Sequence, residues 1–152
     1  MPLGVSRYFA YGSNLSPTQL TKRCPGVRLR GIGKVSGYRL AFTRRSTGWG
    51  GGVADLLPGE GDVWGALYSV TATDLESLDA YEGVPDAYHR GVLQVARPGA
   101  DVVDAWAYFV TRKVPDLLPS YAYWSVIVEG AVEVGLPADY ISLLRAMPHH
   151  GR

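Results

Sequence analysis

The chain has 152 residues, 47% of them apolar, which suffices for a substantial core, and we expect one domain over residues 1–152. Its only cysteine, Cys24, excludes an intramolecular disulfide and a thiolate metal cluster. No stretch reaches the length of a membrane-spanning helix and no signal-peptide pattern begins the sequence. A cytoplasmic protein without membrane contact is therefore expected.

Positive charge is concentrated in residues 1–54, which hold nine lysines and arginines and no acid, although the net charge is only +1. A basic segment can indicate a nucleic-acid partner. These residues are spread over several expected elements and lack the interleaved aromatics of a single-strand binder. We therefore expect a solvated basic face and no nucleic-acid partner.

Hydrophobic periodicity and turn residues predict one mixed domain with several strands, many of them antiparallel, and about four helices. In chain order the expected elements are a strand at Arg7–Ala10, a helix begun by Ser16-Pro17 and ended by Cys24-Pro25-Gly26, strands at Val27–Val35, Tyr38–Thr43, Val53–Leu57 and Val63–Val70, a helix from Thr73 to Tyr81, strands at Tyr88–Ala96 and Val102–Val110, and helices at Tyr121–Val134 and Ala138–Met147. Thr73 and Glu76 have the spacing of a capping box.

The first candidate site is Tyr11-Gly12-Ser13-Asn14, between the first strand and the first helix. Gly12 has no β-carbon, so a ligand can approach the backbone there, and successive N–H groups at a turn can bind negative charge. Ser13 and Asn14 add short hydrogen-bonding side chains. An ordinary strand-to-helix turn would have the same composition, so this segment alone does not define a site.

The second candidate is Glu82, at the expected end of a helix that Gly83 terminates with a left-handed cap. A carboxylate at the negative end of a helix dipole is disfavoured as an anion, so its pKa should rise. A carboxyl group of this kind suits a general base that works near neutral pH. The alternative is a solvent-exposed glutamate at a frayed helix end.

A third group of candidates is aromatic. Tyr123 and its neighbours can hydrogen-bond a substrate carboxylate or amide, although clustered tyrosines also serve in packing. Zinc-ligand spacing, a phosphate loop and a dinucleotide fingerprint are all missing from the sequence. We expect neither a metal nor an organic cofactor.

The order and spacing of these segments resemble the γ-glutamylcyclotransferase family. The residues that carry the resemblance are Phe9–Leu15, Trp64-Gly65, Leu78-Asp79, Glu82-Gly83-Val84, Pro119-Ser120, Tyr123, Gly130-Ala131 and Gly135-Leu136-Pro137. The match extends from about Tyr8 to Met147. It implies an α+β fold, a small mixed β-barrel with flanking helices, and a cavity beside the Tyr11–Asn14 loop with one essential glutamate, Glu82.

The resemblance also implies a reaction in which the α-amine of a γ-glutamyl small molecule attacks the γ-amide carbonyl. The products are 5-oxoproline and a free amine or amino acid, with Glu82 as general acid and base. Candidate substrate-binding residues are Tyr11, Gly12, Ser13, Asn14, Tyr88 and Tyr123. A monomer or a homodimer is compatible with the sequence, and a catalytically inactive module that binds a small metabolite is the main alternative.

The leaving group stays open at this point. A γ-glutamyl-α-amino acid carries a second carboxylate, which Arg44, Arg45 or Arg90 could bind. A γ-glutamylamine, such as a biosynthetic intermediate protected by a γ-glutamyl group, would instead favour acidic residues. Asp79 and Asp86 are the acidic candidates near the expected pocket.

Overall fold

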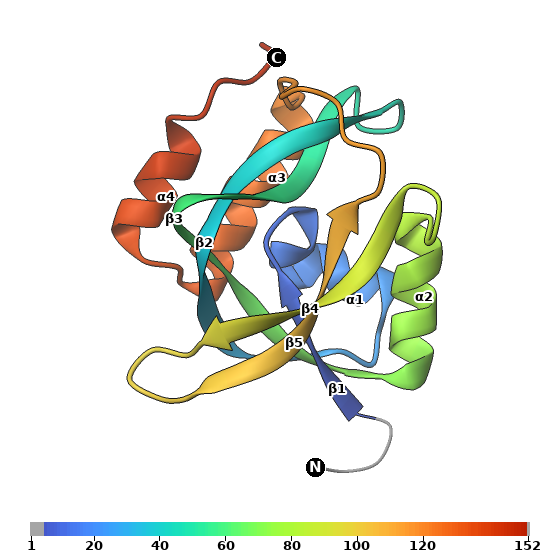
Figure 1. The fold of residues 1–152 in the computed structure, drawn as a ribbon, viewed down its shortest axis with the longest axis vertical. Helices are drawn as coiled ribbons and strands as arrows, with labels where there is room; N and C mark the ends of the chain where they lie inside the picture. The colour runs from blue at the N-terminus through green and yellow to red at the C-terminus, as the bar shows by residue number, and fades with distance from the viewer. Residues whose placement is uncertain (1–4, 152) are drawn as a thin grey trace.

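The structure, a computed structural model, describes residues 5–151, and its strands close into a barrel in the order β1-β3-β2-β4-β5 (Figure 1). The strands are β1 (Val5–Ala10), β2 (Arg28–Ser46), β3 (Gly51–Thr71), β4 (Tyr88–Ala96) and β5 (Val102–Val110). The helical elements are the short 3-10 turn η1 (Ser13–Leu15) and the helices α1 (Pro17–Arg23), α2 (Ala72–Glu82), α3 (Tyr121–Val134) and α4 (Ala138–Arg145). The predicted α+β barrel with flanking helices is confirmed.

Strand pairing makes the barrel mixed, as expected. Neighbouring strands pair antiparallel, including the predicted β4–β5 pair, whereas β1 closes the barrel on β5 through one parallel pair, Tyr8 with Trp106. Helices α3 and α4 lie together beside β2 and β3, and α2 lies near β4 (Figure 1).

Two predicted strand breaks are wrong, because β2 and β3 each run through them as one long strand. Ser36 pairs with Asp62 and Tyr38 pairs with Pro58, so one β2 residue faces three β3 residues between these pairs. The turn residues at 36–37 and 59–62 therefore mark an irregularity in the ladder, where an inserted residue bends and twists the strand pair. A bulge and a turn share the same glycine signal, and sequence alone does not separate them.

The start of α2 also differs from the prediction. The capping box is formed by Thr71 and Asp74, whose side chains each accept a backbone N–H of the other residue. It replaces the predicted pair of Thr73 and Glu76, because the first turn of the helix begins at Ala72. Gly83 ends α2 in the left-handed conformation, as expected, which leaves Glu82 as the last helical residue.

The remaining helices follow the prediction closely. Ser16 caps α1 and Ser120 caps α3 with their side chains, and Gly135 ends α3 in the left-handed conformation. Helix α4 ends at Arg145, two residues before the predicted Met147. Within residues 5–151, no helix has the length and apolar character needed to cross a membrane.

Close packing between α3 and η1 fixes the position of the loop after β1. A β-carbon at Gly130 of α3 would lie 2.6 Å from the Ser16 nitrogen, so only glycine allows the two backbones to approach this closely. Leu15 and Ile127 are almost fully buried in this contact region and belong to the same hydrophobic core. The loop is thus held between the barrel and the C-terminal helices.

Candidate active site

A cavity of about 520 Å³ opens beside the loop between β1 and η1. All seven residues that the sequence singled out line this cavity: Tyr11, Gly12, Ser13, Asn14, Glu82, Tyr88 and Tyr123. They come from four separate parts of the chain, namely the β1–η1 loop, the end of α2, β4 and α3. The structure therefore brings the predicted residues together, while their roles in binding and catalysis stay predictions.

Glu82 is the acidic residue of the cavity wall. Burial raises the pKa of its carboxyl from 4.5 to about 7, although the nearby Arg23 and Arg44 guanidinium groups act to lower it. Within residues 5–151 the carboxyl accepts no hydrogen bond and forms no ion pair that would hold it in place. A carboxyl group near half-ionisation at neutral pH can both accept and donate a proton.

Gly12 leaves just enough room for the hydroxyl of Tyr123. A β-carbon at Gly12 would lie 3.2 Å from that oxygen and 3.0 Å from the Ala54 β-carbon. The Tyr123 hydroxyl in turn accepts a hydrogen bond from the Ala54 N–H at 2.9 Å. The loop, β3 and α3 thus meet at one point of the cavity wall.

We expect Gly12→Ala to lower kcat/KM by about 10-fold or more, because the added methyl group displaces Tyr123 or the loop and misplacement near the reacting centre is costly. Gly48 also lines the cavity, but its added β-carbon would meet only the Ser46 hydroxyl, at 3.9 Å. Gly48→Ala is the matched control, and steady-state kinetics of both variants provide the measurement. Equal kinetics for the two variants would contradict the importance of the Gly12 contact.

Hydrogen-bond directions divide the cavity tyrosines into two kinds. Tyr11 donates its proton to the Tyr108 carbonyl, and Tyr88 donates to the Ala54 carbonyl at 2.9 Å. These two hydroxyls have only lone pairs left for a ligand. Tyr123, by contrast, accepts from a backbone N–H and keeps its own proton for donation. Burial raises the pKa of each hydroxyl above its ordinary value, so all of them stay protonated at neutral pH.

Asn14 hydrogen-bonds two other residues of the cavity wall. Its side-chain amide donates to the Tyr8 hydroxyl at 3.0 Å and accepts from Arg23 at 2.7 Å. The Arg23 guanidinium also lies over the ring of Tyr81, 4.9 Å from the ring centroid. Asn14 therefore orients one cation and one tyrosine hydroxyl on the cavity wall.

Several further residues of the cavity wall were not predicted from the sequence. These are Tyr8, Arg23, Trp49, Tyr81 and Tyr108, together with small residues of β2, β3 and the loop between them. Tyr8 directly precedes the Phe9–Leu15 motif. A tyrosine in a strand next to a candidate loop is a signal that could have pointed to the cavity, because a buried tyrosine hydroxyl needs a hydrogen-bond partner. Arg23 in the last turn of α1 resembles an ordinary cation at a helix C-terminus, so nothing in the sequence distinguished it.

The charged residues that could bind the leaving group differ in whether they line the cavity. Arg44 lines the cavity, is partly buried and forms no hydrogen bond or ion pair with any residue in the range 5–151. Arg45 and Asp86 are exposed and do not line the cavity. Arg90 and Asp79 also lie outside it, and they pair with each other at 2.9 Å. Of the candidate charges, only that of Arg44 faces the cavity.

Residues 5–151 contain no group of three or more histidine, cysteine or carboxylate side chains that could hold a metal ion. His149 stacks on Trp124, with ring centroids 4.1 Å apart, and His89 contacts Thr111 at an exposed position. Both histidines lie away from the cavity.

Comparison with known proteins identifies the family of the chain. The sequence pattern of the AIG2-like family matches residues 62–144. Human γ-glutamylcyclotransferase is 32% identical to the chain over 146 residues, which cover 92% of this chain and 77% of the human protein. The chain belongs to the γ-glutamylcyclotransferase family. Glu82, Tyr88 and Tyr123 lie within the matched AIG2-like segment, and the loop with Gly12 precedes it.

Structural comparison supports membership in the γ-glutamylcyclotransferase family over nearly the whole chain. A solved structure of a γ-glutamyl cyclotransferase superposes with a TM-score of 0.92 at 29% identity, covering 97% of this chain and 90% of that chain. γ-Glutamylaminecyclotransferase B of Danio rerio is 36% identical over 72 residues, which cover 44% of this chain and 38% of that protein. The likeness to the amine-specific enzyme is therefore confined to part of the chain.

Proposed function

We propose that this protein catalyses the cyclising cleavage of γ-glutamyl-α-amino acids to 5-oxoproline and a free amino acid, without a metal or organic cofactor. The observation that carries the proposal is the position of Glu82, a carboxyl with a pKa of about 7 that faces a cavity beside the Gly12 loop. Membership in the γ-glutamylcyclotransferase family supports the same reaction.

The reaction needs one bond made, one bond broken and two protons moved. The α-nitrogen of the substrate attacks the γ-amide carbon, and the bond from that carbon to the amide nitrogen breaks. The α-ammonium loses two protons as it becomes the lactam nitrogen, and the departing nitrogen gains two as it leaves as an ammonium ion. Glu82 can accept each proton from the first nitrogen and pass it to the second before it takes the next, so one carboxyl group carries both protons in turn.

Orientation supplies the other part of the rate enhancement. Attack within the same molecule is favoured when the chain is held folded, and such arrangements reach effective molarities of about 10⁵–10⁸ M. Tyr11 and Tyr88 offer lone pairs, which suit the α-ammonium or the neutral amine that forms from it. Tyr123 offers a proton, which suits a carboxylate or the developing oxyanion.

The Gly12 loop is the proposed site for the oxygen of the scissile carbonyl. Ser13 and Asn14 begin the turn η1, and N–H groups in the first turn of a helical element lack partners within it. The Ser13 N–H is directed at the Tyr123 hydroxyl, which leaves the Asn14 N–H as the proposed donor. Donors in such a position stabilise negative charge that develops on a carbonyl oxygen in the transition state.

We infer the class of leaving group from Arg44. A γ-glutamyl-α-amino acid carries two carboxylates, and the cavity wall carries two guanidinium groups, those of Arg23 and Arg44. Arg23 is held by Asn14 and Tyr81, whereas Arg44 lies near Glu82 and forms no hydrogen bond or ion pair among residues 5–151. A cationic polyamine would meet these positive charges unfavourably. We therefore assign the carboxylate of the leaving amino acid to Arg44.

Arg44→Met is expected to lower kcat/KM for a γ-glutamyl-α-amino acid by about 10–100-fold, the usual cost of a lost charged hydrogen bond. The effect on a γ-glutamylamine without that carboxylate should be small, because Arg44 makes no contact with the glutamyl part in this assignment. Arg45→Met is the matched control, since Arg45 is exposed and one residue away. Release of 5-oxoproline from both substrate classes, followed by mass spectrometry, provides the measurement.

The same two substrate classes, given to the wild-type protein, test the proposed function. Wild-type release of 5-oxoproline from γ-glutamyl-α-amino acids, with weak release from γ-glutamyl polyamines, is the expected result. A preference for the polyamines would instead favour the amine-specific alternative and overturn the role of Arg44. Binding of these compounds without turnover would indicate a module that recognises a metabolite and has no enzymatic activity.

A further inference from the structure

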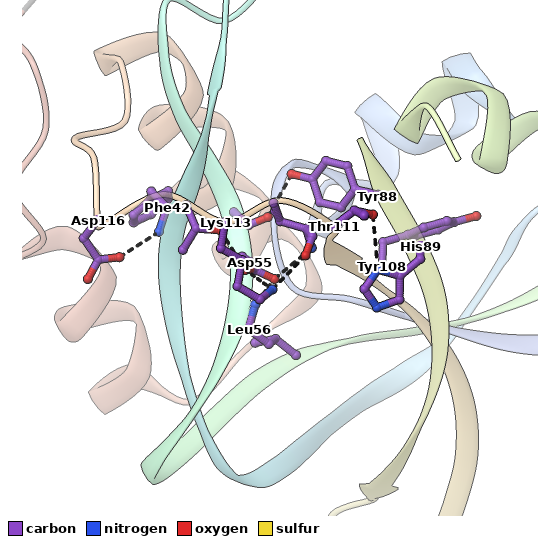
Figure 2. A network of polar contacts seen from close by, with 12 residues as sticks. Phe42, Asp55, Leu56, Tyr88, His89, Tyr108, Thr111, Lys113 and Asp116 are labelled. Carbon is purple, nitrogen blue, oxygen red and sulfur yellow. Dashed lines mark hydrogen bonds and ion pairs between the residues drawn. The ribbon is translucent and has the colours of Figure 1, made fainter. Parts of the chain in front are cut away.

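Asp55 of β3 is a fully buried carboxylate that the proposed reaction does not use. One of its oxygens accepts the backbone N–H groups of Leu56 at 2.9 Å and Val110 at 3.0 Å. The other accepts the Thr43 hydroxyl at 2.7 Å and the Lys113 ammonium at 2.6 Å (Figure 2). A carboxylate removed from water in this way is stable only because all of its partners are in place.

Lys113 brings the cation to this carboxylate from the connection between β5 and α3, residues 111–120, which we call the strap. Its side chain is 39% exposed and also donates to the Val110 carbonyl at 2.9 Å. The strap continues along β2, where the Val114 N–H donates to the Thr43 carbonyl at 2.8 Å. The Asp55–Lys113 ion pair therefore ties together β2, β3, β5 and the strap.

The strap has a second anchor farther from the cavity. Asp116 accepts a hydrogen bond from the Phe42 N–H at 3.3 Å and pairs with Arg39 at 3.0 Å, and both partners belong to β2 (Figure 2). The side chains of Arg39 and Asp116 are each 49% exposed. Arg39, Phe42 and Asp116 do not line the cavity, and this anchor approaches it only through the Phe42 ring, which packs edge-on against Tyr123 with ring centroids 6.4 Å apart. It does not involve Ala54, so the two anchors can be compared.

Ala54, the residue before Asp55, connects the ion pair to the cavity. Its N–H donates to the Tyr123 hydroxyl and its carbonyl accepts from the Tyr88 hydroxyl, both at 2.9 Å. A single residue thus sets the direction of both hydroxyl groups. β3 and β5 are not paired in the barrel, and the Asp55 side chain joins them through the Val110 N–H, directly beside Ala54.

We propose that the Asp55–Lys113 ion pair is a positioning device for catalysis, which holds the Ala54 backbone so that Tyr88 accepts from the substrate while Tyr123 donates to it. The inference rests on the proposed function. Asp55 and Lys113 do not line the cavity, so they act through Ala54 and not by touching substrate. The negative charge of Asp55 is also felt at the cavity, because it adds to burial in raising the pKa of Tyr11 and Tyr88. Lys113 offsets that charge.

Lys113→Met tests the proposal most directly. The variant removes the cation and keeps a side chain of similar length, and we expect kcat to fall by about 10–100-fold, the scale of a misplaced catalytic group. Amide hydrogen exchange measured by NMR should show faster exchange at Ala54, whose N–H would lose its fixed acceptor. Lys113→Arg should restore most of the wild-type kcat and the slow exchange, because it returns a cation to Asp55.

Two matched variants separate positioning from general stabilisation. Arg112→Met removes a neighbouring exposed cation of the strap that has no partner within residues 5–151, and it should change neither kcat nor exchange at Ala54. Asp116→Asn weakens the second anchor, so it should lower the melting temperature while leaving kcat within about twofold of wild type. All rates are taken well below the melting temperature of each variant.

A double variant keeps the test informative if Lys113→Met folds poorly. In Asp55→Asn with Lys113→Met, no unpaired carboxylate is left, and the asparagine carbonyl oxygen can still accept from Leu56 and Val110. This variant should fold and still show the loss of kcat and the faster exchange at Ala54, because the ion pair that joins the strap to β3 is absent.

Three results would overturn the proposal: a folded Lys113→Met with kcat within about twofold of wild type, unchanged exchange at Ala54, or an equal loss of kcat in Asp116→Asn. A wild-type protein that releases no 5-oxoproline would count against the proposed function instead. In that case exchange at Ala54 still decides whether the ion pair holds the backbone.

Discussion

Glu82→Gln is expected to lower kcat for 5-oxoproline release by about 10²–10⁴-fold, the usual contribution of a general acid–base group. Glutamine has nearly the same shape but neither accepts the proton of the α-ammonium nor protonates the departing nitrogen. The carboxyl group makes no hydrogen bond within residues 5–151, so its replacement should leave the surrounding structure in place. KM should change far less than kcat, because the tyrosines and arginines that we propose to bind substrate are intact.

Glu76→Gln provides the matched control for this experiment. Glu76 is an exposed residue of the same helix and does not line the cavity, so its variant should keep the wild-type rate. Steady-state kinetics of the three proteins, with 5-oxoproline measured by mass spectrometry, make the comparison. Substantial turnover by Glu82→Gln would remove Glu82 from the mechanism and direct attention to another proton carrier.

The same substitution should stabilise the fold above neutral pH. The folded-state pKa of Glu82, about 7, lies above its ordinary value of 4.5, so the folded protein binds this proton more tightly than the unfolded chain. The resulting stabilisation is fully present below pH 4.5 and is lost as the pH rises through 7. Glutamine cannot ionise, so Glu82→Gln should exceed wild type in unfolding free energy by up to about 3 kcal/mol at pH 8.5.

Denaturant unfolding at pH 4.5 and pH 8.5 measures this difference. The gap between Glu82→Gln and wild type should widen from the lower pH to the higher one, whereas the gap for Glu76→Gln should stay constant. A constant gap for Glu82→Gln as well would mean that the carboxyl ionises at its ordinary pKa. A positive result would show that the protein retains a destabilising carboxylate, which is expected where a group is kept for catalysis.

Local signals in the sequence predicted the parts of the site that depend on short segments. The Tyr11–Asn14 loop, the left-handed cap at Gly83 and the serine caps of α1 and α3 are each set by a few neighbouring residues. Glu82 could be predicted as a helix-end carboxylate because the glycine at position 83 marks the end of the helix. The main cause of its raised pKa is burial in the cavity, while the prediction had relied on the helix dipole.

Features that depend on distant parts of the chain could not be predicted in the same way. The choice of Arg44 over Arg45 depends on which face of β2 borders the cavity, and bulges in the β2–β3 ladder shift that register. The Arg90–Asp79 pair joins β4 to α2, so neither residue is available to a ligand. Asp55 and Lys113 are 58 residues apart in the sequence, so no local sequence pattern predicts that they pair.

The most direct test of the central claim is the fate of the γ-carbonyl carbon in water enriched in ¹⁸O. Wild-type protein is given a γ-glutamyl-α-amino acid with a ¹⁵N-labelled α-amine, and the products are analysed by mass spectrometry. We predict 5-oxoproline that retains ¹⁵N and contains no ¹⁸O, in equal amount to the released amino acid. Glutamate with ¹⁸O in its γ-carboxylate would instead show that water is the nucleophile, and it would contradict cyclisation by the α-amine.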